Sequence, residues 1–342
     1  MKTAILYWGS KGGAVRQIQN YMHAANDLGL QITWCLSSNF EGISEIHDFT
    51  DNKILLTQIP AHKLSVILNL KLRNRVVKET LRALDSANIQ RVYFLLPHPW
   101  DVLLSKKIHK KTKIEVVRAI HDNKPHKGEV WPSKWTIRTM ARNADYLVTY
   151  SNFVAGSLKK MKKPVLVTSI YEYPIPSEAE KKNFVLHFGR MKKYQGIDNL
   201  EKAWPLLIMK NIDLIVAGNL HRRKKHAILG AKYVEKWLTN DEIEKLISSS
   251  RLVVLPYKEA SQSGIIPLAH ALQTPVVITP VGGMVEQVID GINGVISKST
   301  KPEDIAHSID VALSIKDWKF NQVNFAKEFL TKIGSLEINS FD

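Results

Sequence analysis

The sequence has few of the features that mark secreted, membrane-spanning or metal-binding proteins. Its 342 residues include one cysteine, Cys35, so no disulfide can form within the chain and a reducing compartment is expected. No stretch approaches the roughly 20 apolar residues that span a bilayer. The apolar run at the N-terminus is too short for a signal peptide and lacks a cleavage site. We therefore expect a cytoplasmic protein.

Acidic residues are also in deficit. The chain carries 48 Lys+Arg against 32 Asp+Glu, a formal net charge of +16. Residues 1–163 hold 26 of these cations and 12 of the acids, a net of +14, whereas residues 164–342 are almost balanced at +2. The basic residues alternate with apolar ones instead of forming a low-complexity tail, and no nucleic-acid-binding motif is present, so nucleic acid is not an expected partner. The charge of the first half fits an anionic membrane or a phosphorylated lipid carrier better.

The basic segment at residues 63–82 has two interpretations. It could be a solvated helix face, which is the commoner case. Its apolar positions also permit an amphipathic surface helix that contacts anionic lipid at the inner face of the cell membrane; these positions are Val66, Leu70, Val77 and Leu81.

Short aliphatic and β-branched runs alternate with helical patterns in both halves, which predicts parallel sheets covered by helices. We expect an α/β protein with two Rossmann-like, doubly wound domains that face each other across a cleft. A polar, proline-bearing segment separates residues 1–170 from residues 171–320, and a C-terminal helix at 321–342 is expected to return to the first domain. The expected strands are Thr3–Tyr7, Gln31–Cys35, Arg91–Leu96, Glu115–Ile120, Tyr146–Tyr150, Phe184–Phe188, Asp213–Ala217, Leu252–Leu255, Val276–Thr279 and Gly294–Ile296.

Two motifs in the first half follow predicted strands. Gly12 and Gly13 form a turn that lets the backbone approach a ligand or merely closes a strand–helix connection. The turn is not a GxGxxG pattern, so a dinucleotide site is disfavoured. His121, Asp122 and His126 follow the strand at 115–120, at the sheet edge where ligands bind. The two histidines lack the spacing and further ligands of a metal site.

Three motifs in the second half follow strands and suit an anion. Gly189-Arg190 opens a basic loop that reaches Gly196, and an arginine beside backbone N–H groups suits a diphosphate. A Ser263-Gly264 turn and a glycine-rich turn at 282–283 each lead into a helix start, where backbone N–H groups are available. Packing could explain one such motif, but three in one domain indicate a binding site.

Together these segments resemble the family-4 glycosyltransferases of the GT-B fold. The resemblance rests on Gly189-Arg190, Gly196-Ile197-Asp198, Pro256-Tyr257, Ser263-Gly264 and the segment from Pro275 to Glu286. The turn at Gly12-Gly13 and the segment from His121 to Gly128 are similar to the exopolysaccharide or O-antigen branch of that family. The likeness runs over about residues 1–315.

The resemblance implies that a sugar is moved, with retention, from a UDP- or GDP-sugar to a glycan or lipid-linked acceptor. It also implies a role in bacterial surface polysaccharide or glycoconjugate synthesis, with no metal or other cofactor. His121 and Arg190 would be the catalytic residues, and Asp122 and His126 would lie on the acceptor side. The donor-binding set would be Gly12, Gly13, Gly189, Arg190, Lys193, Glu259, Ser263, Gly264 and Glu286.

The sequence departs from the family at two places. Gln195 occupies the position of a lysine that precedes the loop glycine, and the family's two glutamates fall on Ala260 and Leu268. Glu259 is adjacent to the first of these. Lys192 or Lys193 could replace the missing charge. The alternative is that activity is low or absent, and that the protein binds a sugar nucleotide or a partner without catalysis.

Overall fold

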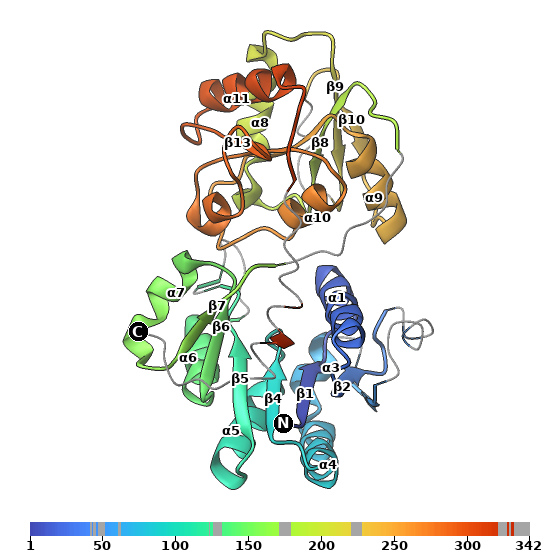
Figure 1. Cartoon of the computed structure of the whole chain (residues 1–342), viewed down its shortest axis with the longest axis vertical. Coiled ribbons are helices and arrows are strands. Elements are labelled where there is room, and N and C mark those ends of the chain that lie inside the picture. Colours follow the sequence, from blue (N-terminus) through green and yellow to red (C-terminus); the bar gives the residue numbers. More distant parts are fainter. Residues whose placement is uncertain are drawn as a thin grey trace. The chain divides into compact units, whose positions relative to one another are not determined.

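The chain divides into two compact units, each built on a parallel sheet (Figure 1). The first unit comprises Met1–Pro125, Val130–Tyr171 and Asn324–Asp342, and the second comprises His126–Glu129 and Glu172–Val323. The computed structural model describes residues 1–41, 43, 46, 52–60, 63–122, 124–125, 132–170, 179–219, 228–320, 327, 330 and 331. The predicted α/β class, with two doubly wound domains, is confirmed.

The first sheet has seven described strands in the order β3-β2-β1-β4-β5-β6-β7, all parallel to their neighbours. Because the chain adds strands in one direction after β1 and in the other after β4, right-handed crossovers place α1 and α4 on opposite faces. The strands are β1 Thr3–Tyr7, β2 Ile32–Ser37, β3 Ile54–Thr57, β4 Arg91–Phe94, β5 Glu115–Ala119, β6 Tyr146–Thr149 and β7 Val165–Val167. The helices are α1 Gly13–Asp27, α3 Lys63–Leu68, α4 Leu70–Ser86, α5 Asp101–Lys111, α6 Lys134–Arg142, α7 Asn152–Leu158 and the 3₁₀ turn η1 Lys159–Met161.

The second sheet has six described strands in the order β10-β9-β8-β11-β12-β13, again all parallel. Its strand order reverses between β8 and β11, as the first sheet's does between β1 and β4. The strands are β8 Phe184–Phe188, β9 Asp213–Ala217, β10 Lys232–Val234, β11 Leu252–Leu255, β12 Val276–Ile278 and β13 Gly294–Ile296. The helices and 3₁₀ turns are η2 Lys193–Gln195, α8 Ile197–Ala203, η3 Trp204–Leu206, α9 Asn240–Ser249, α10 Ile265–Ala271, η4 Gly282–Glu286 and α11 Pro302–Ser314.

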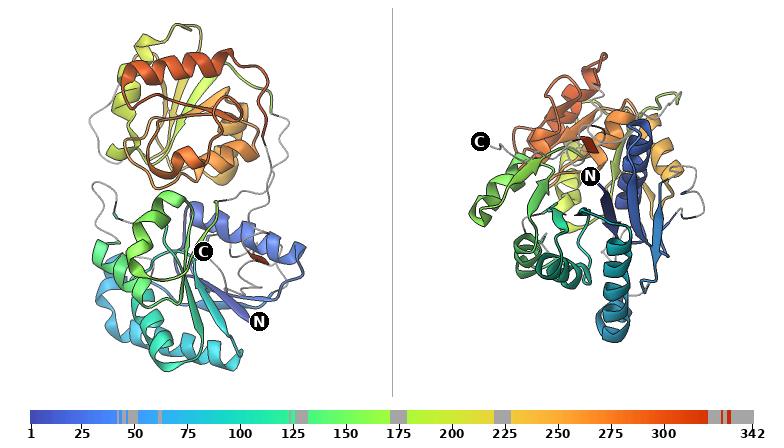
Figure 2. Two further views of the ribbon diagram at one scale, coloured as in Figure 1. Left: turned by 60° about the vertical axis from the view of Figure 1, so that its left-hand side comes forward. Right: turned by 60° about the horizontal axis from the view of Figure 1, so that its bottom comes forward.

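Apolar burial on both faces of the second sheet explains why its strands are almost wholly aliphatic. Helices cover both faces of this sheet (Figure 2). One buried cluster joins α9 and α10 to the sheet, and another joins α8 and α11 to the opposite face. Side chains cap several helices, which supplies acceptors for amides that the helix itself leaves unpaired. Thr239 caps α9, and Ser133 and Ser151 cap α6 and α7.

Three strands were not predicted, and all three lie at sheet edges. β3 and β7 are the outer strands of the first sheet, and β10 is an outer strand of the second. β7 and β10 have only three residues each, and no residue of β3 is fully buried. Runs of three or four residues are too short to show a clear strand pattern, which explains why these three were missed.

The basic segment is not one amphipathic surface helix. It forms α3 and α4, which are divided at Asn69, whose side chain accepts a hydrogen bond from Leu72 N. Val66 is 8% exposed and Val77 is 0% exposed, because both pack into the core of the first unit, whereas Leu70 is 52% exposed. The apolar positions expected to meet lipid are therefore mostly used by the protein's own core.

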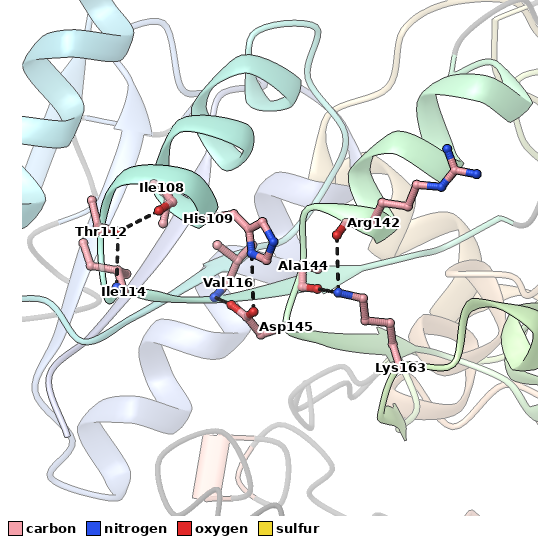
Figure 3. Close-up of polar contacts among 9 residues, drawn as sticks. All are labelled: Ile108, His109, Thr112, Ile114, Val116, Arg142, Ala144, Asp145 and Lys163. Carbon is pink, nitrogen blue, oxygen red and sulfur yellow. Dashed lines mark hydrogen bonds and ion pairs between the residues drawn. The ribbon is translucent and has the colours of Figure 1, made fainter.

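Polar contacts at the amino ends of β5 and β6 hold helix ends to the first sheet (Figure 3). Asp145 Oδ2 accepts a hydrogen bond from Val116 N at 2.8 Å, and Asp145 Oδ1 lies 3.5 Å from His109 Nδ1. Lys163 Nζ donates to Ala144 O at 2.5 Å, just after α6 ends. These side chains contact backbone and helix ends, which indicates a structural role for this edge.

The expected C-terminal helix at 321–342 lies mostly outside the described residues. Of those that are described, Lys327 Nζ pairs with Asp27 Oδ2 at the end of α1, at 2.8 Å, and Leu330 is buried. Within the described part of the chain, no helix has the length and apolar character needed to cross a membrane.

Candidate functional site

The motifs of the second unit come together at the carboxyl edge of its sheet. β8, β11 and β12 are neighbours in the sheet, and the loops after them carry Gly189-Arg190, Ser263-Gly264 and Gly282-Gly283. The strand order reverses between β8 and β11, and ligands of doubly wound folds bind at such a reversal. The first two motifs flank that point.

Glycines allow these loops to lie directly against one another. Gly196 has a φ of 71°, and a side chain there would overlap Pro256 O in the loop after β11. A side chain on Gly218, at the end of β9, would overlap Gly189 O in the same way. The loops after β8, β9 and β11 thus contact each other through backbone atoms. These contacts fix the backbone positions from which the side chains of the site project.

Gln195, which the sequence resemblance matched with a lysine, links two of these loops. Its side-chain Oε1 accepts from Lys192 N at 2.9 Å, and its Nε2 donates to Tyr257 Oη at 3.1 Å. The residue is 4% exposed, and Tyr257 is buried as well. Burial raises the pKa of Tyr257 to about 12, so its phenol remains protonated and neutral. Neither the neutral amide of Gln195 nor the protonated phenol of Tyr257 therefore supplies a charge to the site.

Two cations of the loop after β8, Arg190 and Lys193, remain at the surface. Arg190 is exposed, and its Nη2 donates to Tyr194 Oη at 3.1 Å. The ring of Tyr194 packs edge-on against that of Tyr257, with centroids 6.0 Å apart. Lys193 is exposed on η2. The hydrogen bond to Tyr194 positions the guanidinium of Arg190 at the sheet edge, where the residue remains exposed.

The other predicted donor-binding residues of the second unit lie on the two neighbouring loops, whereas Gly12 and Gly13 of the same set lie in the first unit. Ser263 N–H donates to Gln287 Oε1 at 2.8 Å, and Gln287 Nε2 donates to Ser263 O at 3.0 Å. The Ser263 amide that was expected to meet a phosphate is thus already used within the protein. Gly264 is exposed at the start of α10, Glu259 is half-buried, and Glu286 is exposed on η4.

One ion pair at this edge was not expected from the sequence. Lys258 Nζ pairs with Asp198 Oδ2, which joins the loop after β11 to the first turn of α8. The two side chains are 40% and 39% exposed. The contact depends on the adjacency of β8 and β11 in the sheet, and sequence separation conceals that adjacency.

In the first unit, the predicted residues also lie at carboxyl ends of strands, but on separate loops. Gly12 has a φ of 90° and precedes α1, and nothing lies within 4 Å of a side chain placed on Gly12 or Gly13. Packing therefore does not require these two glycines, although the φ of Gly12 favours one. His121 and Asp122 follow β5, and β4 separates β5 from β1. His126 lies outside the described residues.

His121 is positioned by two neighbours. Its Nε2 lies 3.1 Å from Leu95 O, and its ring stacks on Tyr150 with centroids 4.4 Å apart. A carbonyl oxygen only accepts, so Nε2 carries the proton and Nδ1 is the unprotonated nitrogen. Burial lowers the pKa of His121, although nearby Asp122 opposes that effect. The imidazole is neutral at pH 7.

The sequence interpretation missed His98, which lies between the β1 and β5 loops. It follows β4, and its ring packs edge-on against both Trp8 and Trp100, with centroids 5.8 Å away in each case. Trp100 N donates to His98 Nδ1 at 3.2 Å, which leaves the proton of the neutral ring on Nε2. Burial lowers the pKa of His98 to about 4. The Pro97-His98-Pro99 run directly after a predicted strand was the available signal.

A buried ion pair stabilises the β4 loop that carries His98. Asp101 Oδ2 accepts from Arg118 Nη1 at 3.0 Å and from His98 N at 2.9 Å. Arg118 also lies over the Phe94 ring, 4.0 Å from its centroid. Both charged side chains are fully buried, so removing either one would leave an uncompensated charge in the core.

Among the described residues, no three His, Cys, Asp or Glu side chains form a group that could hold a metal ion.

Comparison with known proteins shows what the second unit is similar to. Residues 172–328 match the family model for Glycosyl transferases group 1. The second unit is thus similar to glycosyltransferase group 1 domains. Over 166 residues the chain is 31% identical to "Uncharacterized glycosyltransferase MJ1607" of Methanocaldococcus jannaschii, a match that covers 44% of this chain and 40% of that relative. Matches to three curated glycosyltransferases of this organism cover 40% to 56% of their lengths.

Solved structures confirm the GT-B arrangement of elements in both units. The sucrose-phosphate synthase of Thermosynechococcus elongatus has a TM-score of 0.74 at 14% identity, covering 99% of this chain and 100% of that one. Anabaena Alr3699/HepE, in complex with UDP and glucose, has a TM-score of 0.69 at 14% identity, covering 97% and 95%. At these identities the likeness establishes the fold alone. The expected resemblance to glycosyltransferases is confirmed, while the family-4 exopolysaccharide branch stays a prediction.

Proposed function

We propose that the protein is a glycosyltransferase that binds a nucleoside diphosphate sugar at the carboxyl edge of the second sheet. The main support is the linked set of loops after β8 and β11, which presents the guanidinium of Arg190, hydrogen-bonded to Tyr194, at the point where the strand order reverses. The UDP complex of the Anabaena structure with the same fold supports a UDP-sugar as donor, with a GDP-sugar as the alternative.

The proposed chemistry is electrostatic. When the sugar–diphosphate bond breaks, negative charge grows on the diphosphate and positive charge grows on the sugar. Arg190, with a lysine of the neighbouring loops, stabilises the leaving diphosphate from a position fixed before the reaction. In the first unit, His121 presents an unprotonated Nδ1 that accepts a hydrogen bond from a sugar hydroxyl, with Asp122 beside it. The anomeric configuration is retained, and no metal is required.

The acceptor is proposed to be a glycan or a lipid-linked glycan of bacterial surface polysaccharide or glycoconjugate synthesis. The net charge of the first half supports an anionic acceptor or membrane, because binding one sugar nucleotide would not require a net charge of +14. Exposed cations lie on α4, namely Lys71, Arg75, Lys78 and Arg82, and the neighbouring Leu68 and Leu70 are also exposed. This surface would bring a cytoplasmic protein to the inner face of the membrane, where a lipid-linked acceptor resides.

The test is donor turnover with a panel of UDP- and GDP-sugars, measured as release of the nucleoside diphosphate. We expect Arg190→Ala to lower turnover about 100-fold or more, because it removes a charged donor from the leaving group. Arg251→Ala is the matched control: Arg251 lies just before β11, at its opposite end, and donates to Leu313 O. Turnover by Arg190→Ala close to that of the wild type would overturn the role of Arg190.

The rival function is binding of a sugar nucleotide or a partner without catalysis. Its support is Gln195, which is neutral and has both ends of its amide engaged where the family has a charge. Tight binding of a donor without turnover, with a full range of acceptors present, would favour this rival.

A further inference from the structure

The proposed donor site needs a cation that Gln195 does not provide. Both ends of the Gln195 amide are used, one by Lys192 N and the other by Tyr257 Oη. The side chain is also enclosed, because a Cβ on Gly189 would overlap its Nε2. A second positive charge beside Arg190 must therefore come from another residue if two cations are to stabilise the diphosphate there.

Lys258 lies directly against the loop at this position. Its backbone N–H donates to Tyr194 O at 2.7 Å, so its main chain is joined to the residue that precedes Gln195. Its Cγ would lie 3.6 Å from a Cβ on Gly196, the residue that follows Gln195. The stem of Lys258 thus runs across the backbone of residues 194–196, although it enters from the loop after β11.

The ammonium of Lys258 is oriented and still accessible. Its pairing with Asp198 directs it toward the start of α8, and the side chain remains 40% exposed. An ammonium has three N–H donors, and Asp198 uses one of them, so two can be given to phosphate oxygens. Lys193 is exposed on η2 and is the competing candidate.

We propose that Lys258 binds the diphosphate of the donor, in place of the lysine that is absent at position 195. Asp198 is then a positioning residue, because it holds the lysine across Gly196. The assignment rests on the proposed function, since it requires a nucleoside diphosphate at this edge. The lysine expected from the family would lie on the loop after β8. Here the positive charge comes from the loop after β11 and lies in the same site.

The test compares a nucleoside diphosphate with its monophosphate. Calorimetry would give Kd values of UDP, GDP, UMP and GMP for the wild type, Lys258→Met and Lys258→Arg. We expect Lys258→Met to weaken the preferred diphosphate about tenfold or more, as for loss of a charged hydrogen bond. The monophosphate of the same nucleoside should change less than twofold, and Lys258→Arg should retain most of the diphosphate affinity.

Lys232→Met is the matched control, because Lys232 also pairs with an aspartate, Asp213, at 2.7 Å, but at the amino end of β9. Its affinities should equal those of the wild type, and thermal melts should show that all variants are folded. Unchanged diphosphate binding by Lys258→Met would overturn the inference alone, as would equal losses for mono- and diphosphate. A selective loss in Lys193→Met instead would assign the charge to Lys193. If the wild type bound neither UDP nor GDP, the proposed function would fall together with this inference.

Discussion

At the residue scale, the geometry of the candidate site depends on glycines that contact backbone atoms. Gly196 and Gly291 have almost the same backbone angle, with φ of 71° and 72°. They differ in surroundings: a Cβ on Gly196 would overlap Pro256 O, whereas nothing lies within 4 Å of one on Gly291. Alanine substitutions at the two positions therefore distinguish two contributions to the loss of stability, that of an unfavourable backbone angle and that of a steric clash.

We expect Gly291→Ala to lower the free energy of unfolding by about 1 kcal/mol, the cost of a left-handed alanine. Gly196→Ala should cost about 3 kcal/mol, because the loops after β8 and β11 must also separate. It should in addition weaken nucleoside diphosphate binding, while Gly291→Ala should not. Urea denaturation and calorimetry measure both effects. Equal destabilisation by the two changes would contradict the close contact at Gly196.

The sequence predicted which motifs of the second unit lie at one edge of its sheet, but not the contacts among their residues. The Gly189-Arg190 motif was recognisable, because the residues that define it are adjacent in the chain. The links from Gln195 to Tyr257 and from Lys258 to Asp198 cross about 60 positions and exist because β8 lies beside β11. His98 was overlooked because its ring is positioned by packing between Trp8 and Trp100. The apolar pattern of the preceding strand, β4, does not predict that packing.

At the scale of elements, the interior strands and the edge strand β13 were predicted, whereas the edge strands β3, β7 and β10 were not. An interior strand such as β11 is buried on both faces and reads as an unbroken aliphatic run. β3, β7 and β10 have one neighbour each, and runs of only three or four residues suffice there. The division of the basic segment at Asn69 was missed as well, because a capping asparagine inside a helical pattern is a weak local signal.

The exposed face of α4 carries the proposed contact with anionic lipid. A variant with Lys71, Arg75, Lys78 and Arg82 changed to glutamine should bind vesicles of one-third phosphatidylserine at least 100-fold more weakly. Each basic residue near such a surface contributes about 1 kcal/mol. Co-sedimentation with vesicles at moderate salt measures the loss, and neutral vesicles should bind neither protein.

The matched control removes four cations from a different part of the same unit. Lys106, Lys110 and Lys111 on α5, together with Lys113 just beyond it, are exposed and reduce the net charge equally when changed to glutamine. This control should retain most of the vesicle binding. Equal losses in both variants would show attraction by net charge instead of docking through α4.

At the scale of the whole molecule, buried histidines should make the fold sensitive to acid. Burial lowers the pKa of His98, His187 and His270 to about 4 in each case. Between about pH 6.5 and 4 the unfolded chain binds protons at these sites and the folded chain does not, so stability falls as the pH falls. Asp101 acts the other way, because burial raises its pKa from 3.8 to about 6.

We expect the free energy of unfolding to decrease from pH 7 to pH 4, as measured by urea denaturation. His187 is fully buried and alone should account for about 3 kcal/mol, since each pKa unit corresponds to 1.36 kcal/mol. His187→Asn keeps an N–H donor for Val254 O and should flatten the profile. The exposed His307, changed to asparagine, is the control. An unchanged pH profile in His187→Asn would contradict the prediction.

The connection of the two units has a consequence for synthesis on the ribosome. Because Lys327 pairs with Asp27 and Leu330 is buried in the first unit, that unit recruits residues from both sides of the second. The second unit is thus an insertion, and its sheet can be completed while the first unit still lacks its last segment. Domains usually fold in the order in which they emerge. Here the first unit is translated first but completed last, because its final segment leaves the ribosome only after the second unit has been made.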